Sequence, residues 1–439
     1  MLIHSRIAPR CRILFASALF ALASASLASA ATLCVQPQGH LGCQKTIGAA
    51  VAAAAPGAVI YVWPGVYKEE VTITQSVSLV AVPGSNTVID ATGLPNGIFI
   101  DGRSGSPNAG VSNVLISGFD VRNANFEGIL VLSGSNITLT DNHVHNNDLS
   151  LDIAAGDCPN QPAFETNEGD DCGEGIHLMG ADHSTVRDSE VDHNSGGILI
   201  SDESGPNQSN LITGNSVHDN AYDCGITLAS HPPAVDLVPS ATVSFGVWNN
   251  TISHNDSYHN GTQVPGAGAG VGIFAAGPGT TNTGNVVIGN TLRNNGMPGF
   301  AMHNHAAPPG APPVNLNNNV IVGNTISGNA ADTADTATAG PTGINIASQA
   351  PISGMVISGN DIDNEAIAIA YSAPSGQLSV HFNDLPRSIG IENLGTGTID
   401  ATENWWNCAN GPGSGHCASV SGTGINTAPW LFTPAAVNY

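Results

Sequence analysis

The stretch Gly197-Ile198-Leu199-Ile200 decides the fold, because variants of it recur along most of the chain. Each copy starts with a small residue, which is followed by an apolar residue and then by two positions of mostly apolar character. Neighbouring copies begin 22 to 47 residues apart, which indicates a repeat architecture whose units bury their apolar faces against each other. The other copies begin at Gly97, Gly128, Gly175, Gly225, Gly272, Gly299, Gly343, Ala366 and Gly390.

Asparagines form a second pattern, since Asn-x-(Val/Ile/Leu) occurs once in most repeats and another asparagine follows five residues later. Asparagine tolerates left-handed backbone and bonds turn amides, so each column is interpreted as an internal ladder at one turn. With short strands and a coil spacing of ~4.8 Å, the patterns predict about ten stacked coils and exclude an α/β fold. The first predicted ladder contains Asn142, Asn215, Asn250, Asn290, Asn324 and Asn360, and the second contains Asn147, Asn194, Asn220, Asn255, Asn295 and Asn329.

The first 30 residues have the features of an export signal. Three arginines precede an apolar run at 13–22, and a small-residue cleavage site ends at Ala30. The apolar run is too short to span a membrane. The sequence therefore predicts a secreted or periplasmic protein that begins near Ala31 and is not inserted in a membrane.

The charge of the chain restricts its partners. After the export signal, 34 acidic residues stand against seven basic ones, a net charge of −27. Nucleic acid requires a basic surface and is excluded as a partner, and a polyanionic substrate would be repelled unless a cation bridged it.

The cysteines agree with an oxidising compartment. Cys34 and Cys43 lie close together near one end of the chain, and Cys408 and Cys417 lie close together near the other, so each pair is predicted to form a disulfide. Cys11 lies within the export signal, and the partners of the other three cysteines stay open; these are Cys158, Cys172 and Cys224.

Both ends of the chain resemble those of a known group. An alanine-rich helix is expected at 46–56 and a strand at 58–63, and the following "PGVYKEEVTI" at 64–73 resembles the opening of secreted right-handed parallel β-helix proteins of the pectin lyase-like superfamily. Its GxYxE element at 65–69 is similar to one in pectin methylesterases. The tail from Asn404-Trp405-Trp406 to Pro429-Trp430-Leu431 resembles the tails of the same superfamily.

The resemblance implies an all-β fold, a single-stranded right-handed parallel β-helix with an N-terminal capping helix and a disulfide-closed C-terminal cap. The predicted segments are the signal at 1–30, the N-terminal cap at 31–75, the β-helix at 76–400 and the C-terminal cap at 401–439. No catalytic motif accompanies the fold: QDTL, DFIFG, NTD, GHG and DPH are all absent. The resemblance therefore carries the architecture and leaves the chemistry to individual residues.

Five insertions predict a groove over the sheet that contains the glycine phrase. Those at 149–173, 261–270 and 330–342 precede the strand in their coils, and those at 231–243 and 305–315 follow it. Insertions gathered around one sheet of a solenoid usually wall its binding face.

Strand alternation selects the side chains that face this groove. Glu203 and His231 fall in one column on adjacent coils, with Asp202 beside them, and carboxylates facing histidines suit acid/base cleavage of a sugar chain. The predicted catalytic residues are Glu174, Asp202, Glu203, Asp223, His177 and His231, and the predicted substrate-binding residues are His303, His305, Phe274 and Asn345. Asp170 and Asp171 are weaker candidates, as Ca²⁺ ligands on the acidic loop.

A second cluster follows the ladder turns. We favour a structural interpretation, because His-Asn and His-Asp pairs recur there as turn residues and no insertions wall that surface. Metal binding by these histidines stays open as the alternative. The members of the cluster are His143, His145, Asp192, His193, His218, Asp219 and His254.

These features predict a monomeric, secreted protein that cleaves a polysaccharide by carboxylate acid/base chemistry. Two alternatives remain open. One is a lyase or epimerase with a histidine base and possible Ca²⁺, and the other is a non-catalytic module that binds a glycan at the cell surface.

Overall fold

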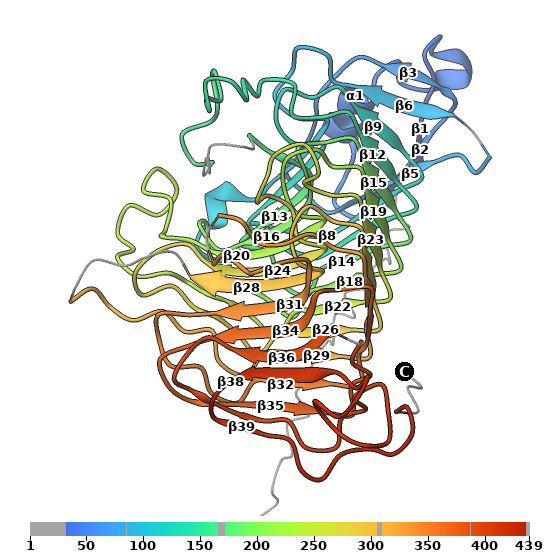
Figure 1. The fold of residues 1–439 in the computed structure, drawn as a ribbon. Helices are drawn as coiled ribbons and strands as arrows, with labels where there is room; N and C mark the ends of the chain where they lie inside the picture. Colours follow the sequence, from blue (N-terminus) through green and yellow to red (C-terminus); the bar gives the residue numbers. More distant parts are fainter. Residues whose placement is uncertain are drawn as a thin grey trace, which may run out of the picture.

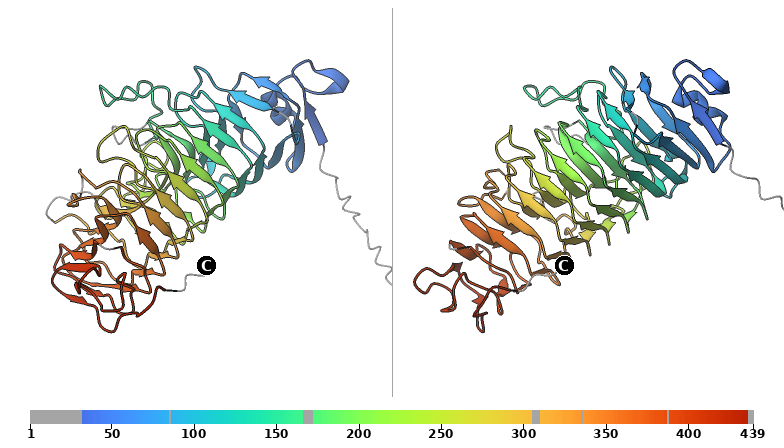
Figure 2. Two further views of the ribbon diagram at one scale, coloured as in Figure 1. Left: turned by 45° about the vertical axis from the view of Figure 1, so that its right-hand side comes forward. Right: turned by 90° about the vertical axis from the view of Figure 1, so that its right-hand side faces the viewer.

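The computed structural model describes residues 32–84, 86–165, 172–304, 310–334, 336–386 and 388–435. Short parallel strands are stacked along one axis, and the chain advances from one end of the stack to the other (Figure 1; Figure 2). Successive strands enter different sheets, so that each circuit of the chain adds one coil. The described residues therefore form the predicted parallel β-helix.

The sheet that carries the glycine phrase has 12 strands among the described residues and is called the groove sheet here. It contains all ten predicted strands, plus β4 before them and β38 after them. Its strands are β4 (Val71–Ile73), β7 (Ile98–Asp101), β10 (Ile129–Leu132), β13 (Glu174–Met179), β16 (Gly196–Ser201), β20 (Ile226–Ser230), β24 (Val271–Ala275), β28 (Phe300–Asn304), β31 (Thr342–Ala347), β34 (Ile367–Ser372), β36 (Ile389–Asn393) and β38 (Ser419–Gly422).

Two further long sheets complete the coils. The 14-stranded sheet contains β1 (Thr32–Val35), β2 (Ala58–Val62), β5 (Val77–Ala81), β8 (Val111–Ser117), β11 (Gly134–Thr140), β14 (Thr185–Arg187), β18 (Leu211–Thr213), β22 (Thr251–Ser253), β26 (Val286–Ile288), β29 (Val320–Val322), β32 (Val356–Ser358), β35 (Gln377–His381), β37 (Thr398–Asp400) and β39 (Ile425–Asn426). The ten-stranded sheet contains β3 (Gly65–Tyr67), β6 (Thr87–Asp90), β9 (Asp120–Arg122), β12 (His143–His145), β15 (Glu190–Asp192), β19 (Ser216–His218), β23 (Asp256–Tyr258), β27 (Thr291–Arg293), β30 (Thr325–Ser327) and β33 (Asp361–Asp363). A three-stranded sheet holds β17 (Asn207–Gln208), β21 (Val247–Trp248) and β25 (Asn282–Thr283).

The glycine of the repeated phrase marks a close approach between coils. A Cβ atom on Gly197 would lie 2.2 Å from the carbonyl oxygen of Gly225, in the next coil, and 2.5 Å from a methyl group of Val217. Gly128 and Gly175 are confined in the same way by the next coil's backbone and by the amide of a ladder asparagine. Glycine is therefore required at these three positions, whereas the isoleucine that follows each of them enters the core.

The strand register corrects two of the predicted copies. Val271 pairs with Ile226, so Gly270 and not Gly272 occupies the glycine column. Likewise Ile344 pairs with Ile369, which places Ala368 in the column instead of Ala366. Each prediction was shifted by two residues. Because side chains alternate between the faces of a strand, a shift of two leaves every side chain on its predicted face. One consequence is that Phe274 pairs with His303, and the two rings lie 4.5 Å apart.

Ladders of buried asparagine connect the coils, as predicted. In each ladder an Asn Nδ2 donates to the Oδ1 of the asparagine in the next coil, for example from Asn220 to Asn260 at 2.9 Å and from Asn260 to Asn295 at 3.1 Å. This ladder ends at the carboxyl group of Glu365, which accepts from Asn329 at 3.0 Å.

One coil was assigned to the wrong ladders. Asn215 donates to Asn255 and not to Asn250, which belongs to a third ladder with Asn210. Asn260 takes the place predicted for Asn255. The coil contains three asparagines at five-residue intervals, Asn250, Asn255 and Asn260, so the sequence alone permits either assignment and the contacts between coils decide it.

Both ends of the stack are covered. Helix α1 (Ile47–Ala53) begins after Thr46, whose side chain accepts from the Ala49 amide. The carboxylate of Glu69 accepts from the amides of Ile47 and Gly48, both at 2.8 Å, and its negative charge suits the helix start. The GxYxE element is therefore structural in this chain. The other helical segments among the described residues are two short 3-10 turns, η1 (His40–Gly42) and η2 (Arg103–Gly105).

The predicted N-terminal cap at 31–75 was expected to hold the helix and the first strands, and its strands β1 and β2 pair within the 14-stranded sheet. At the other end, the fully buried Trp406 closes the core. The predicted signal at 1–30 lies outside the described residues. Among those described, no helix is long and apolar enough to cross a membrane.

The predicted disulfides Cys34–Cys43 and Cys408–Cys417 are both formed. A third joins Cys158 to Cys172 and settles the pairing that the sequence left open. Cys224 is buried and forms no disulfide.

Candidate active site

A cavity lies over strands β13, β16 and β20 of the groove sheet, and Glu127, just before β10, also lines it. Carboxyl groups and imidazoles dominate its polar lining, and most come from consecutive coils. Its titratable lining residues, apart from the disulfide-bonded Cys172, are Glu127, Glu165, Glu174, His177, Glu203, Asp223 and His231.

His177 occupies the centre of this cluster. Its Nδ1 atom lies 3.0 Å from a carboxyl oxygen of Glu127 and 3.6 Å from one of Glu165, and its Nε2 atom lies 2.8 Å from the Ser201 hydroxyl. Burial lowers the pKa of His177, but the Glu127 carboxylate and its neighbours outweigh burial and raise that pKa to about 9. The ring is therefore an imidazolium at neutral pH.

Glu203 and His231 face each other from adjacent coils, as strand alternation predicted. A carboxyl oxygen of Glu203 lies 2.7 Å from the Nδ1 atom of His231, and both side chains are less than 5% exposed. Burial raises the pKa of Glu203, but the charges of His231 and His177 outweigh it and lower that pKa to about 2. Glu203 is therefore ionised at neutral pH.

Glu165 enters the cavity from the insertion at 149–173, and its side chain is only 4% exposed. Burial, followed by repulsion from the Glu127 carboxylate, raises the pKa of Glu165 to about 8. This carboxyl group therefore carries a proton at neutral pH, in contrast to Glu203.

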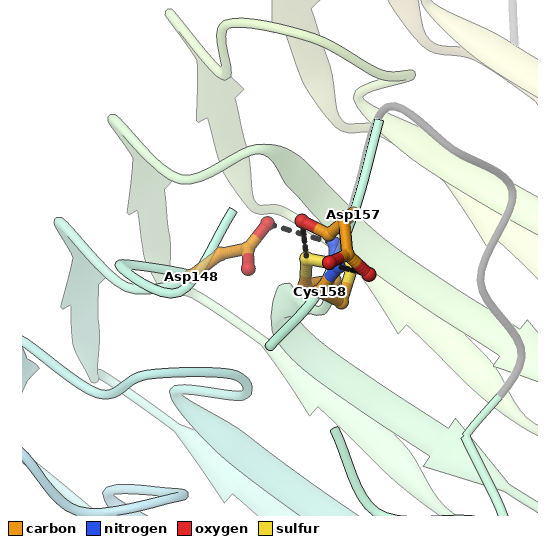
Figure 3. The surroundings of a disulfide bond; sticks show 4 residues. Asp148, Asp157 and Cys158 are labelled. Atoms are coloured by element: carbon orange, nitrogen blue, oxygen red, sulfur yellow. Dashed lines mark hydrogen bonds between the residues drawn. A yellow bond between two sulfur atoms is a disulfide. The ribbon is translucent and has the colours of Figure 1, made fainter. Parts of the chain in front are cut away.

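The insertion that carries Glu165, called the lid here, is fastened at its base. The disulfide joins Cys158, within the insertion, to Cys172 near its C-terminal end. The Cys172 amide donates to Asp148 at 3.0 Å, and the Cys158 amide donates to the Asp157 side chain (Figure 3). Burial raises the pKa of Asp148 to about 7.

The lid is also held by apolar contacts of Phe164. Phe164, the residue before Glu165, packs against a cluster that includes Phe99 and Leu130 on the groove sheet. The guanidinium of Arg103 lies 5.1 Å from the centre of the Phe99 ring and 5.8 Å from that of Phe164. Glu165 is thus positioned by its immediate neighbour in sequence.

Residues 84–238 match the family model for the right-handed β-helix region. Together with the parallel coils described above, this match shows that the chain folds as a right-handed parallel β-helix. No curated protein sequence matches it.

Solved structures agree with this fold. DFA-IIIase from Arthrobacter chlorophenolicus A6 in complex with GF2 has a TM-score of 0.52 at 14% identity, over 87% of this β-helix chain and 93% of the other. The Agl-KA catalytic domain scores 0.48 at 14% identity, over 87% of this chain and 64% of its own length. The GH87 alpha-1,3-glucanase of Streptomyces thermodiastaticus strain HF3-3 scores 0.45 at 15% identity, over 87% and 65%. The β-helix thus spans less than two thirds of the last two proteins, and likeness at these identities shows the fold alone.

Asp202 does not line the cavity of the β-helix, contrary to its predicted place among the catalytic residues. Its carboxylate accepts from the His231 amide at 2.7 Å, from the Ser244 hydroxyl at 2.6 Å and from the Ser230 hydroxyl at 3.2 Å. Burial, with repulsion from Glu203, raises the pKa of Asp202 to about 6. Asp202 secures the strand end from which His231 projects.

Glu174 and Asp223 do line the cavity, on the two sides of Gly196. Among the predicted substrate-binding residues, Phe274 and His303 contact each other on the next coils and are not part of the cavity lining. The Asn345 amide instead donates to the insertion at 330–342, through the Thr336 carbonyl and Asp332. His305, Asp170 and Asp171 lie outside the described residues.

Two cavity residues escaped the sequence reasoning. Glu127 occupies the same position before its glycine as Glu174 does one coil later, since Ile129 pairs with Ile176. That recurrence was a usable signal. Glu165 had no such signal, because the insertion that contains it has no repeating sequence pattern.

The cavity also offers a set of cation ligands. One ligand atom each from Glu127, Glu174 and His177 lies within 4.8 Å of the other two. Calcium prefers six to eight oxygen ligands, so a set that includes an imidazole suits calcium poorly. The predicted Ca²⁺ ligands, Asp170 and Asp171, lie outside the described residues and stay a prediction.

Proposed function

We propose that this β-helix protein is a secreted glycoside hydrolase that acts on a polysaccharide of neutral or weakly acidic character. One observation carries the proposal: two carboxyl groups line the same cavity with pKa values driven apart, about 8 for Glu165 and about 2 for Glu203. Such a pair supplies an acid and an anion at the same pH, which is what glycosidic cleavage requires.

The roles follow from the protonation states. Glu165 donates its proton to the oxygen of the leaving sugar, and Glu203 serves as base or nucleophile on the other side of the bond. Glu127 holds the His177 ring, whose imidazolium keeps Glu203 ionised. His231 contributes to the same effect through its contact with Glu203.

A histidine base is less well supported. His177 would have to lose a proton before it could abstract one from a sugar carbon, and its pKa of about 9 keeps it protonated at neutral pH. This argues against the lyase or epimerase alternative at that residue. The strongly acidic chain also favours a neutral glycan over a polyanion.

A polysaccharide panel tests the proposal. Each polymer is incubated with the protein, and both new reducing ends and the absorbance of unsaturated sugars are measured. Reducing ends without absorbance support hydrolysis, whereas absorbance indicates a lyase and overturns the proposal. Binding without either signal would leave the glycan-binding alternative.

The pH profile of the reaction should have its alkaline limb near pH 8. Raising the pH through the Glu165 pKa of about 8 removes the proton that the leaving group needs, whereas Glu203 stays ionised at any pH above about 2. We expect kcat/KM to be level near neutral pH and to fall above about 8. An aryl glycoside with a good leaving group needs no acid, so its profile should lack that limb. A limb of equal size for both substrates would contradict the assignment.

Removing the lid disulfide should impair activity more than stability. Cys158→Ser with Cys172→Ser releases a loop with a sequence separation of 14 between its ends, and Glu165 loses its fixed position. We expect kcat to fall ~100-fold, because small displacements of a catalytic group are costly. The thermal midpoint of the stack should change little, since the lid lies outside the coils. An unchanged kcat would show that Phe164 alone holds the lid.

A further inference from the structure

The ten-stranded sheet carries a second group of side chains, away from the groove sheet. Strands β9, β12 and β15 lie side by side along one edge of the stack in Figure 1, whereas β13, β16 and β20 face another direction. In each of the three strands the central valine is fully buried, so the residues on either side of it point outward. The outward residues are Asp120 and Arg122, His143 and His145, and Glu190 and Asp192.

The two histidines of β12 interact with both neighbouring strands. The Nε2 atom of His143 lies 2.6 Å from a carboxyl oxygen of Asp192, and the Nε2 atom of His145 lies 3.2 Å from one of Asp120. The two rings are stacked, with centroids 4.1 Å apart and 19° between their planes.

Three side chains, one carboxylate and two imidazoles, converge at this point. One ligand atom each from Asp120, His143 and His145 lies within 4.8 Å of the other two. Ligand atoms around a bound zinc ion lie about 2.0–2.2 Å from the metal, so the three side chains need to close by only ~1 Å. They can do so, because their side chains are 22%, 40% and 13% exposed and stand on the surface of the sheet.

The side chain of Asn146 contacts the His145 ring on the side away from its Nε2 atom and fixes the orientation of the ring. The Nδ1 atom of His145 lies 2.6 Å from the amide group of Asn146, whose two ends are interchangeable by a half turn. With the amide oxygen towards the ring, Asn146 accepts the Nδ1 proton and leaves Nε2 available for a metal.

We propose that Asp120, His143 and His145 bind a divalent transition-metal ion of the Zn²⁺ or Ni²⁺ class, which joins strands β9 and β12. Two imidazoles and one carboxylate suit these ions better than Ca²⁺ or Mg²⁺. The ion would connect two successive coils on a face that shares no residue with the cavity. The inference is independent of the proposed hydrolase.

A neighbouring set competes for the same histidine. His143 also forms a group with Glu190 and Asp192, again with ligand atoms within 4.8 Å. We assign the ion to the Asp120 side because that set contains two imidazole nitrogens, which bind such metals more strongly than carboxylates do. The assignment predicts that His145 is required and Glu190 is not.

The site is tested by titrating the full-length, tag-free protein with Zn²⁺ in a calorimeter. We expect one equivalent to bind here, and Zn²⁺ to raise the thermal midpoint of the protein. His145→Ala and Asp120→Asn should each weaken this binding at least ~10-fold, since metal affinity depends on every ligand. Asp120→Asn preserves shape and guards against a folding defect.

Two control variants make the test decisive. His183→Ala removes an exposed histidine that lies 3.5 Å from one carboxylate, Asp182, and is in no described three-ligand group, so it should bind Zn²⁺ as the wild type does. Glu190→Gln should also be unaffected. The proposal is wrong if His145→Ala retains wild-type affinity, if Glu190→Gln abolishes binding, or if His183→Ala weakens it equally.

Discussion

Replacement of Glu203 by glutamine is expected to lower kcat by about a thousand-fold. Glutamine has the same shape and can still contact His231, so the cavity should keep its form. It cannot carry the negative charge that His177 and His231 stabilise at Glu203, and so it can act neither as base nor as nucleophile. Initial rates of reducing-end release on the polymer that the wild type cleaves measure the effect.

The matched control for this variant is Glu403→Gln, which makes the same chemical change at an exposed residue near the C-terminal end of the stack. Its kcat should equal that of the wild type. If Glu203→Gln retains activity within a few-fold, the carboxyl pair is not the catalytic machinery. If instead it loses the thermal transition of the wild type, Glu203 is chiefly structural.

Substitution of Gly197 by alanine should cause a large loss of stability. The added Cβ atom would lie 2.2 Å from the Gly225 carbonyl oxygen, and a backbone atom in the middle of a stack cannot move aside cheaply. Overpacking of a core typically costs 1–3 kcal/mol, and we expect about 3 kcal/mol of unfolding free energy here. The shift of the urea midpoint, followed by circular dichroism, measures the loss.

Gly340→Ala provides the comparison. A Cβ atom at this position would meet the Ala366 side chain at 3.1 Å and no other atom within 4 Å, so its cost should stay below about 1 kcal/mol. Equal losses in the two variants would contradict the explanation that coil approach selects glycine.

The architecture could be predicted from the sequence because it repeats. The glycine phrase identified the strands of the groove sheet, and alternation identified the buried side of each strand. Register was harder, since Gly270-Val271-Gly272-Ile273 contains two possible starts for one phrase. Insertions of different lengths separate the coils, so counting along the chain cannot choose between them. Contact with the neighbouring coil makes that choice.

The site was predictable to the extent that it lies on the repeat. Glu203 and His231 were paired correctly because they occupy one column on adjacent coils. Alternation stops at the end of β16, and for that reason it could not show that Asp202 turns towards the amide of His231. The position of Glu165 could not be predicted, since it depends on a disulfide and on the packing of Phe164 rather than on the sequence repeat.

The side-chain amides of the asparagine ladder give the solenoid a dipole along its axis. From Asn147 through Asn194 and Asn220 to Asn329, every Nδ2 group donates towards the C-terminal end, so the amide dipoles are aligned along the axis. Reversing a single amide would set two donors or two acceptors against each other at its neighbours. The orientation of the whole column is therefore fixed collectively, and Glu365 accepts at its positive end, where a carboxyl oxygen is the complementary partner.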